Sequence, residues 1–162
     1  MNQRDRFIQR CLGVAVVSAA SLILVIGFWQ PAGAQSTGAA TLTVHVTGAR
    51  NAKGQIRAAL FRSAKGFPND ASQAVQTQAA DIDPQALSAQ IVFKGLHEGV
   101  YTVSVFHDEN VNQKLDKNFM GIPKEGYGAS NNPKRRMGPP SFEETKFQLN
   151  ETDRSLEIKL IY

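Results

Sequence analysis

One segment of the chain, residues 100–107 (VYTVSVFH), limits what the protein can fold into more than any other. Its residues are β-branched or aromatic almost throughout, a composition typical of strands. Because successive side chains of a strand point to opposite faces, the alternation places apolar groups on both faces of this one. A strand with two apolar faces lies inside a sheet that is covered on both sides. The segment therefore predicts a β-sheet protein with residues 100–107 at its centre.

Several further segments alternate in the same way. They cover residues 41–47, 55–62, 87–94, 142–149 and 155–162. Turn-forming residues separate the first two segments, which we expect to form a hairpin. Residues 71–80 fit either a short helical turn or an edge strand. Six or seven short strands, with no amphipathic helical stretch between them, predict an all-β antiparallel sandwich of about seven strands.

The first 34 residues have the pattern of a secretory signal helix. Three arginines precede an uncharged apolar run at residues 12–29, and Ala32-Gly33-Ala34 supplies the small residues that signal peptidase requires. Cleavage would leave Gln35 as the first residue, with 35–40 as a flexible lead-in and 41–162 as the domain. The apolar run is also long enough to span a bilayer, so an uncleaved N-terminal anchor is the alternative.

Charge and cysteine content narrow the classes of function. The net charge is +4, and the first 34 residues contribute three arginines and one aspartate, or +2, which leaves +2 for the rest. That bias is too weak to predict binding to nucleic acid. The single cysteine, Cys11, precedes the apolar run. Export without disulfides fits a bacterial protein of the periplasm or the extracellular space.

Residues 108–141 follow the central strand and carry no strand or helix pattern. A connection this long is uncommon inside a compact domain and is usually functional, or ordered by contacts other than secondary structure. We therefore look for a site in this loop, and above all between residues 108 and 132.

The first part of the loop has oxygen-bearing side chains at steps of two, a spacing found in calcium loops because alternate side chains point toward a central cation. The candidate ligands are Asp108, Asn110, Asn112 and Asp116. The match is partial, since Gln113 stands where such loops have glycine and Phe119 where they have a bidentate glutamate. The alternative is that these side chains form Asx-turns in a long loop.

Four residues are candidates for binding a partner: His107, Glu109, Tyr127 and Asn131. His107, with the carboxylates beside it, also offers an acid and a base for an enzyme, but it equally fits a hydrogen-bonded histidine at the edge of the core. Tyr127 lies in a segment rich in glycine and proline, residues 121–128, which fits either a recognition surface or a loop packed on itself. We assign no catalytic residue, because no complete set of catalytic groups is present.

Three longer motifs carry a family resemblance: GLHEGVYTVSVFHDEN, KLDKNFMGIPKEGYGASNN and PPSFEETKFQL. They resemble a bacterial family of exported proteins known as domain of unknown function 2141, over roughly residues 42–162. The resemblance implies an immunoglobulin-like, prealbumin-type sandwich. Members of that family usually have D-x-N-G-N-G-x-L-D in this loop, so Val111 and Gln113 replace two expected glycines, which weakens the calcium hypothesis.

These observations predict an exported, non-catalytic binding or accessory module of the bacterial cell envelope that uses residues 108–132. Its partner would be an envelope protein or a glycan, and not nucleic acid. Contact with a membrane is expected only through the N-terminal segment, if that segment is not cleaved. The alternatives are a module stabilised by calcium, the one ion that the sequence suggests, and an enzyme that uses His107 with nearby carboxylates.

Overall fold

The computed structural model describes residues 39–134, 138–150 and 153–162. Residues Ser36–Tyr162 form one compact unit. The predicted signal segment, and the lead-in up to residue 38, lie outside the described residues. Within the described part of the chain, no helix is long and apolar enough to cross a membrane.

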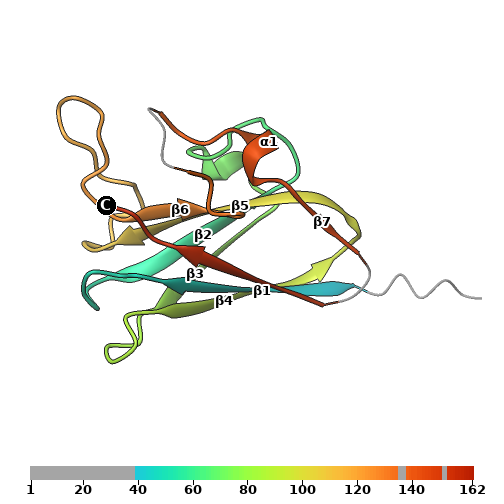
Figure 1. Ribbon diagram of the computed structural model, residues 1–162, viewed down its shortest axis with the longest axis horizontal. Coiled ribbons are helices and arrows are strands. Elements are labelled where there is room, and N and C mark those ends of the chain that lie inside the picture. The colour runs from blue at the N-terminus through green and yellow to red at the C-terminus, as the bar shows by residue number, and fades with distance from the viewer. Residues whose placement is uncertain (1–38, 135–137, 151–152) are drawn as a thin grey trace, which may run out of the picture. The chain divides into compact units, whose positions relative to one another are not determined.

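The described residues form two β-sheets (Figure 1). The three-stranded sheet has the order β4 (Ala89–Leu96), β1 (Ala40–Thr47), β8 (Arg154–Lys159). The five-stranded sheet has the order β3 (Gln76–Asp81), β2 (Gln55–Phe61), β5 (Gly99–Asp108), β6 (Tyr127–Ala129), and β7 (Phe147–Leu149) also pairs with β5. All pairs are antiparallel except β1 and β8, which are parallel.

One hydrophobic core fills the space between the sheets, so the prediction of an all-β sandwich is confirmed. The core draws on the inward faces that the alternation predicts in β1, β2, β4 and β5: Leu42, Val44, Val46, Ile56, Ala58, Leu60, Ala89, Ile91, Phe93, Tyr101, Val103 and Val105. Burial of each large apolar side chain stabilises the fold by about 1.5–3 kcal/mol. Residues 100–107 lie in β5, which pairs with β2 on one side and with β6 and β7 on the other, as expected of a central strand.

The predicted hairpin between the first two strands is wrong. Strand β1 pairs with β4 and β8, whereas β2 pairs with β3 and β5 in the other sheet. Alternation identifies which face of a strand is buried but not which strand is its neighbour. Residues 48–54 therefore cross from one sheet to the other.

Two further segments differ from the prediction. Residues 142–149 begin as the one-turn helix α1 (Phe142–Thr145), which is closed by a capping box between Ser141 and Glu144, and only the last three form β7. Strand β6 lies within residues 108–141, where no strand was expected, and Leu87 lies in a turn with φ 49° instead of in β4. Residues 71–80 contain both open alternatives, the 3₁₀ turn η1 (Ala71–Gln73) and most of the edge strand β3.

Candidate functional site

Strand β5 ends in two fully buried polar residues, His107 and Asp108, and the long loop starts directly after them. The loop returns to the sheet at Glu125, which is also buried. Buried polar groups of this kind persist only when they are hydrogen-bonded. The bonds that these three side chains make therefore determine how the loop is held.

The two buried carboxylates hold the base of the loop. Asp108 accepts the backbone N–H of Asn112 through Oδ1 and that of Gln113 through Oδ2, both at 2.9 Å. Glu125 accepts the backbone N–H of Glu109 through Oε1 at 2.9 Å and that of Asp116 through Oε2 at 3.0 Å. All four carboxylate oxygens thus bind backbone N–H groups that lack strand partners. The loop is ordered by its own side chains.

His107 is held by hydrogen bonds at both ring nitrogens. Nε2 lies 2.7 Å from the carbonyl oxygen of Lys53, and Nδ1 lies 2.7 Å from the hydroxyl of Tyr162. A carbonyl can only accept, so Nε2 carries the proton; in the neutral ring Nδ1 then accepts from the Tyr162 hydroxyl. The neighbouring Gly54 has φ +68°, and a Cβ there would lie 1.9 Å from the Asp108 carbonyl oxygen, so only glycine fits beside the end of β5. An enzymatic role for His107 gains no support, because the ring is fully buried and both nitrogens are engaged.

Glu109 connects the start of the loop to the turn at residues 48–54. Its Oε1 lies 2.5 Å from Nη2 of Arg50 in an ion pair, and its Oε2 accepts from Nδ2 of Asn51 at 3.3 Å. The Arg50 guanidinium also lies over the ring of Tyr162, 4.7 Å from its centroid. Burial is the largest cause that raises the pKa of the Tyr162 phenol above its usual 10.0. The Arg50 backbone N–H, which donates to that phenol, lowers the pKa in part.

Three of the four predicted calcium ligands, Asn110, Asn112 and Asp116, are brought together, whereas both carboxylate oxygens of the fourth, Asp108, bind backbone N–H groups. Asp116 accepts Nδ2 of Asn110 at 2.8 Å and Nδ2 of Asn112 at 3.1 Å. The amide oxygens of the two asparagines form Asx-turns with the backbone N–H groups of Asn112 and Lys114. Within the described ranges, no group of three or more His, Cys, Asp or Glu side chains has the arrangement of a metal site.

The backbone of this segment adopts the left-handed conformation at two residues. Val111 has φ 58° and Gln113 has φ 66°. These are the two positions where the resemblance described above implies glycine. A β-branched residue at positive φ is an outlier, because its side chain crowds the backbone. Val111 and Gln113 therefore occupy a conformation that suits glycine better.

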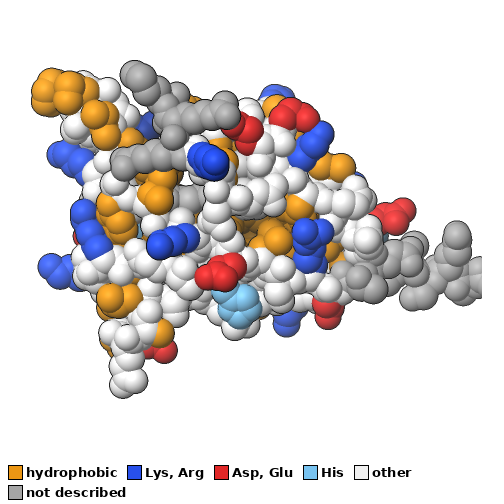
Figure 2. Space-filling model, viewed as in Figure 1, with side chains coloured by type: hydrophobic (Ala, Val, Ile, Leu, Met, Phe, Trp, Pro, Cys, Tyr) orange, Lys and Arg blue, Asp and Glu red, His pale blue; other side chains and the backbone are white. Residues whose placement is uncertain are grey.

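The far end of the loop is a closed tip, residues 117–123, that displays apolar side chains to solvent. Asn118 organises it: the backbone N–H of Asn118 donates to the Ile122 carbonyl at 2.8 Å, and its Oδ1 accepts from the N–H groups of Met120 and Ile122 at 3.0 and 2.9 Å. Phe119 is 96 % exposed, Met120 64 % and Ile122 49 %. The loop projects from one end of the sandwich (Figure 1), and Figure 2 shows hydrophobic side chains gathered on the projection at the upper left.

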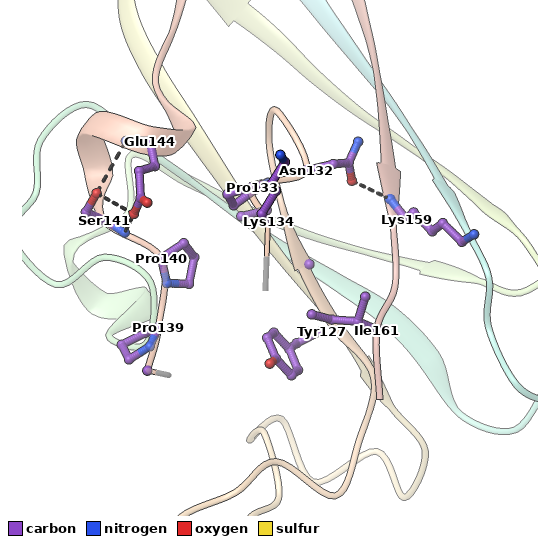
Figure 3. Close-up of a pocket in the computed structure, with 13 residues that line it drawn as sticks. Tyr127, Asn132, Pro133, Lys134, Pro139, Pro140, Ser141, Glu144, Lys159 and Ile161 are labelled. Atoms are coloured by element: carbon purple, nitrogen blue, oxygen red, sulfur yellow. Dashed lines mark hydrogen bonds between the residues drawn. The ribbon is translucent and has the colours of Figure 1, made fainter. Parts of the chain in front are cut away.

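A hollow of about 360 Å³ lies between β6, β8 and the segment before α1 (Figure 3). Tyr127 and Ile161 line one wall, Pro139 and Pro140 face them, and Lys134 contributes a charge. Tyr127 belongs to β6 and pairs with Phe106, so it is part of the sheet instead of a free loop contact. Of the four predicted binding residues, Tyr127 alone lines this hollow.

Asn131 lies far from His107. Its Nδ2 donates to the Lys146 carbonyl at 2.9 Å, next to α1. The neighbouring Ser130 accepts the backbone N–H of Val103 at 3.0 Å and donates to the Thr145 carbonyl at 2.6 Å, which ties α1 to β5. Val103 precedes His107 by four residues, or roughly 13 Å of strand. The predicted binding residues therefore occupy separate places: His107 and Glu109 at the loop base, Tyr127 at the hollow and Asn131 beside α1.

A sequence model of the bacterial family described as "uncharacterized protein conserved in bacteria (DUF2141)" matches residues 44–157. The chain belongs to this family. The match runs from β1 to β8 and contains the whole of the long loop. No curated protein and no solved structure matches this DUF2141 chain.

The exposed apolar tip was not predicted for the DUF2141 chain. Phe119 drew attention at a ligand position of the calcium pattern and as an aromatic residue near Tyr127, and Met120 and Ile122 were given no role. The signal was present, because three large apolar residues surround Gly121 in a polar loop. Apolar residues in a loop usually pack onto the domain, and only the structure places these in solvent.

Proposed function

We propose that this DUF2141 protein is a non-catalytic binding module of the bacterial cell envelope, and that the tip at residues 117–123 makes the contact with its partner. The observation that carries the proposal is the almost complete exposure of Phe119 on a loop that is otherwise closed by hydrogen bonds. A large apolar side chain held in water has no stabilising role in the domain itself. Such exposed apolar groups commonly mark a surface that another molecule covers.

The loop is suited to binding because it is already ordered. Asp108 and Glu125 fix its base, and Asn118 fixes its tip. A contact loop that keeps one conformation loses less conformational entropy on binding than a flexible one. The apolar tip makes a glycan the less suitable of the two predicted partners, because a glycan offers mainly polar groups to Phe119 and Met120.

One feature of the sequence supports a location in the cell envelope. Residues 1–34 combine basic residues, an apolar run and small residues in the order of a signal peptide. The remaining chain has no cysteine, so its folding needs no particular redox compartment.

Photo-crosslinking in the producing bacterium tests the proposal. A benzophenone amino acid replaces Met120 in the full chain, and a matched control carries it at Gln78, which is exposed on the edge strand β3. The proposal expects a discrete adduct, with protein or with lipid, from position 120 and none from position 78. Equal labelling from both positions, or none from position 120, would refute the tip as the binding surface.

A module stabilised by calcium is the second candidate, because Asn110 and Asn112, two of its predicted ligands, both lie within hydrogen-bonding distance of a third, Asp116. The two asparagines turn Nδ2 toward Asp116, so both amides would have to rotate to offer oxygen to an ion. Calcium takes six to eight oxygen ligands, so the cluster would need backbone carbonyls as well. If calcium binds the folded state, millimolar calcium raises the melting temperature by mass action. Asp116→Asn should reduce that rise, and the control variant Asp81→Asn on β3 should not. A melting temperature that is the same in calcium and in chelator removes this candidate.

A further inference from the structure

We propose that the partner of the tip is the surface of an anionic lipid bilayer, into which Phe119, Met120 and Ile122 insert while the lysines around them contact the headgroups. This inference rests on the proposed function and names the partner of the same surface. It also differs from the expectation that membrane contact involves only the N-terminal segment.

The apolar residues are arranged to enter a soft apolar phase. Phe119 and Met120 are the most exposed large apolar residues of the described chain, and Ile122 is exposed beside them. The space next to Gly121 is open, since a Cβ placed there would meet no atom within 4 Å. The tip is therefore convex and unobstructed, and it can insert without any rearrangement of the domain. Apolar side chains that insert this way lie about 5–10 Å deep, at the boundary of headgroups and acyl chains.

The size of the apolar surface favours a bilayer over a protein groove. A stable protein–protein interface takes about 20–30 residues from each partner, with fully buried apolar residues at its centre. The tip offers three apolar side chains on a narrow projection, and lysines surround them. A bilayer requires no complementary shape, so a small convex apolar surface is sufficient.

The charges around the tip are positive. Lys114, Lys117 and Lys124 are all exposed. Of the two acidic residues in the same segment, Glu125 is buried on backbone N–H groups, and Asp116 is half-buried and accepts the two asparagine amides. Lysine is depleted in protein interfaces, but each lysine close to an anionic membrane strengthens binding about fivefold. The charge pattern therefore matches anionic headgroups.

The experiment uses the chain from Gln35 onward, because the hydrophobic core of the described residues lies between Ala40 and Tyr162 in one compact unit. The single tryptophan, Trp29, is then absent. Phe119→Trp consequently introduces one fluorophore at the tip. Its emission is followed with vesicles of phosphatidylcholine alone and with vesicles that contain phosphatidylglycerol. We expect a blue shift, and quenching by brominated acyl chains, only with the anionic vesicles.

Sedimentation with the same vesicles compares matched variants, whose folding is checked by their melting temperatures. The first pair removes exposed apolar groups. The tip variant combines Phe119→Ser, Met120→Ser and Ile122→Ser, and its control combines Val75→Ser and Val100→Ser. The second pair neutralises three exposed lysines. The tip variant combines Lys114→Gln, Lys117→Gln and Lys124→Gln, and its control combines Lys65→Gln, Lys94→Gln and Lys159→Gln. We expect the two tip variants to lose at least tenfold in affinity and the two controls to keep it.

Binding that survives replacement of the three apolar residues would overturn insertion, and equal binding to neutral vesicles would overturn the headgroup contact. Absence of vesicle binding together with a protein adduct from position 120 would overturn the lipid partner but leave the proposed function intact. If the protein neither binds vesicles nor forms an adduct from position 120, both the lipid partner and the proposed function are overturned. The full chain, carrying the same variants, checks that the differences persist when residues 1–34 are present.

Discussion

The phenol oxygen of Tyr162 lies 2.7 Å from Nδ1 of the fully buried His107 and accepts the backbone N–H of Arg50 at 3.0 Å. One hydroxyl thus joins the end of β5 to the turn at residues 48–54. Because the Lys53 carbonyl fixes the proton on Nε2, the Tyr162 hydroxyl supplies the hydrogen that Nδ1 needs. His107 is thereby a structural residue, and Tyr162 is its essential partner.

Removing that hydroxyl should destabilise the domain. Tyr162→Phe leaves Nδ1 of a buried imidazole and the Arg50 N–H without their partner, so we expect the free energy of unfolding to fall by about 1–3 kcal/mol. Urea denaturation measures the change. Tyr127→Phe is the matched control, since the Tyr127 ring lines the hollow and the ring nitrogens of His107 bond to Tyr162 and Lys53 instead. A loss equal in the two variants would contradict the assigned role of the bond.

The raised pKa of Tyr162 predicts a specific loss of stability in alkaline solution. The folded state holds the phenol proton to a higher pH than the unfolded state, whose pKa is near 10.0. The stabilisation is therefore complete below that value and is lost as pH rises through the folded pKa. We expect wild-type stability to decline more steeply than that of Tyr162→Phe when unfolding is measured from about pH 8 to about pH 11. Parallel curves for the two proteins would be inconsistent with burial of the phenol.

Glu125 should control the order of the loop. In Glu125→Gln the amide keeps one acceptor oxygen, so its NH₂ group faces the second backbone N–H as donor against donor. We expect a loss of about 1–3 kcal/mol, and faster hydrogen exchange at the amides of Glu109 and Asp116 while the Val103 amide in β5 remains protected. Glu143→Gln, on an exposed side chain of α1, is the control and should change stability by less than about 1 kcal/mol. Unchanged exchange at Glu109 and Asp116 would show that other contacts hold the loop base.

Val111→Gly should stabilise the protein. The left-handed conformation costs a residue with a side chain about 1–2 kcal/mol, while glycine has about 0.5–1 kcal/mol of extra unfolded-state entropy to lose. We expect a net gain of about 0.5–1 kcal/mol in urea denaturation. Val100→Gly is the opposite control: Val100 is exposed in β5, where glycine should destabilise. A decrease in stability with Val111→Gly would contradict the φ of 58° at this residue.

The sequence was sufficient to predict the long strands β1, β2, β4 and β5, but not the short strand β6 or the pairing of the strands. Period-two alternation at 41–47, 55–62 and 100–107 gave the buried faces correctly, because burial acts on each residue separately. The neighbours of β1 are β4 and β8, whose residues lie more than 40 positions away, and no local pattern encodes that choice. At 142–149 the local signal existed but was overlooked, since Ser141 and Glu144 have the spacing of a capping box.

For the candidate site, sequence reasoning pointed to the loop at residues 108–132, but it gave weight to other residues of that loop than the structure does. The oxygen-bearing side chains drew attention to Asp108 and Asp116, and the structure uses both to bind the loop's own backbone and amides. Glu125 was overlooked, because a glutamate beside glycines reads as solvent-exposed until its carboxylate is seen to accept two N–H groups. The exposure of Phe119 depends on where the whole loop projects, which is a property of the tertiary structure.

The residues that fix the conformation of the loop are different from the residues that the loop exposes at its tip. Asp108 and Glu125 bind backbone N–H groups, and Asn118 does the same at the tip, so the conformation does not depend on the side chains at positions 119, 120 and 122. Those three positions are therefore free to vary without loss of the fold. The domain should accept grafted recognition sequences there, and related chains can evolve different specificities on one unchanged scaffold.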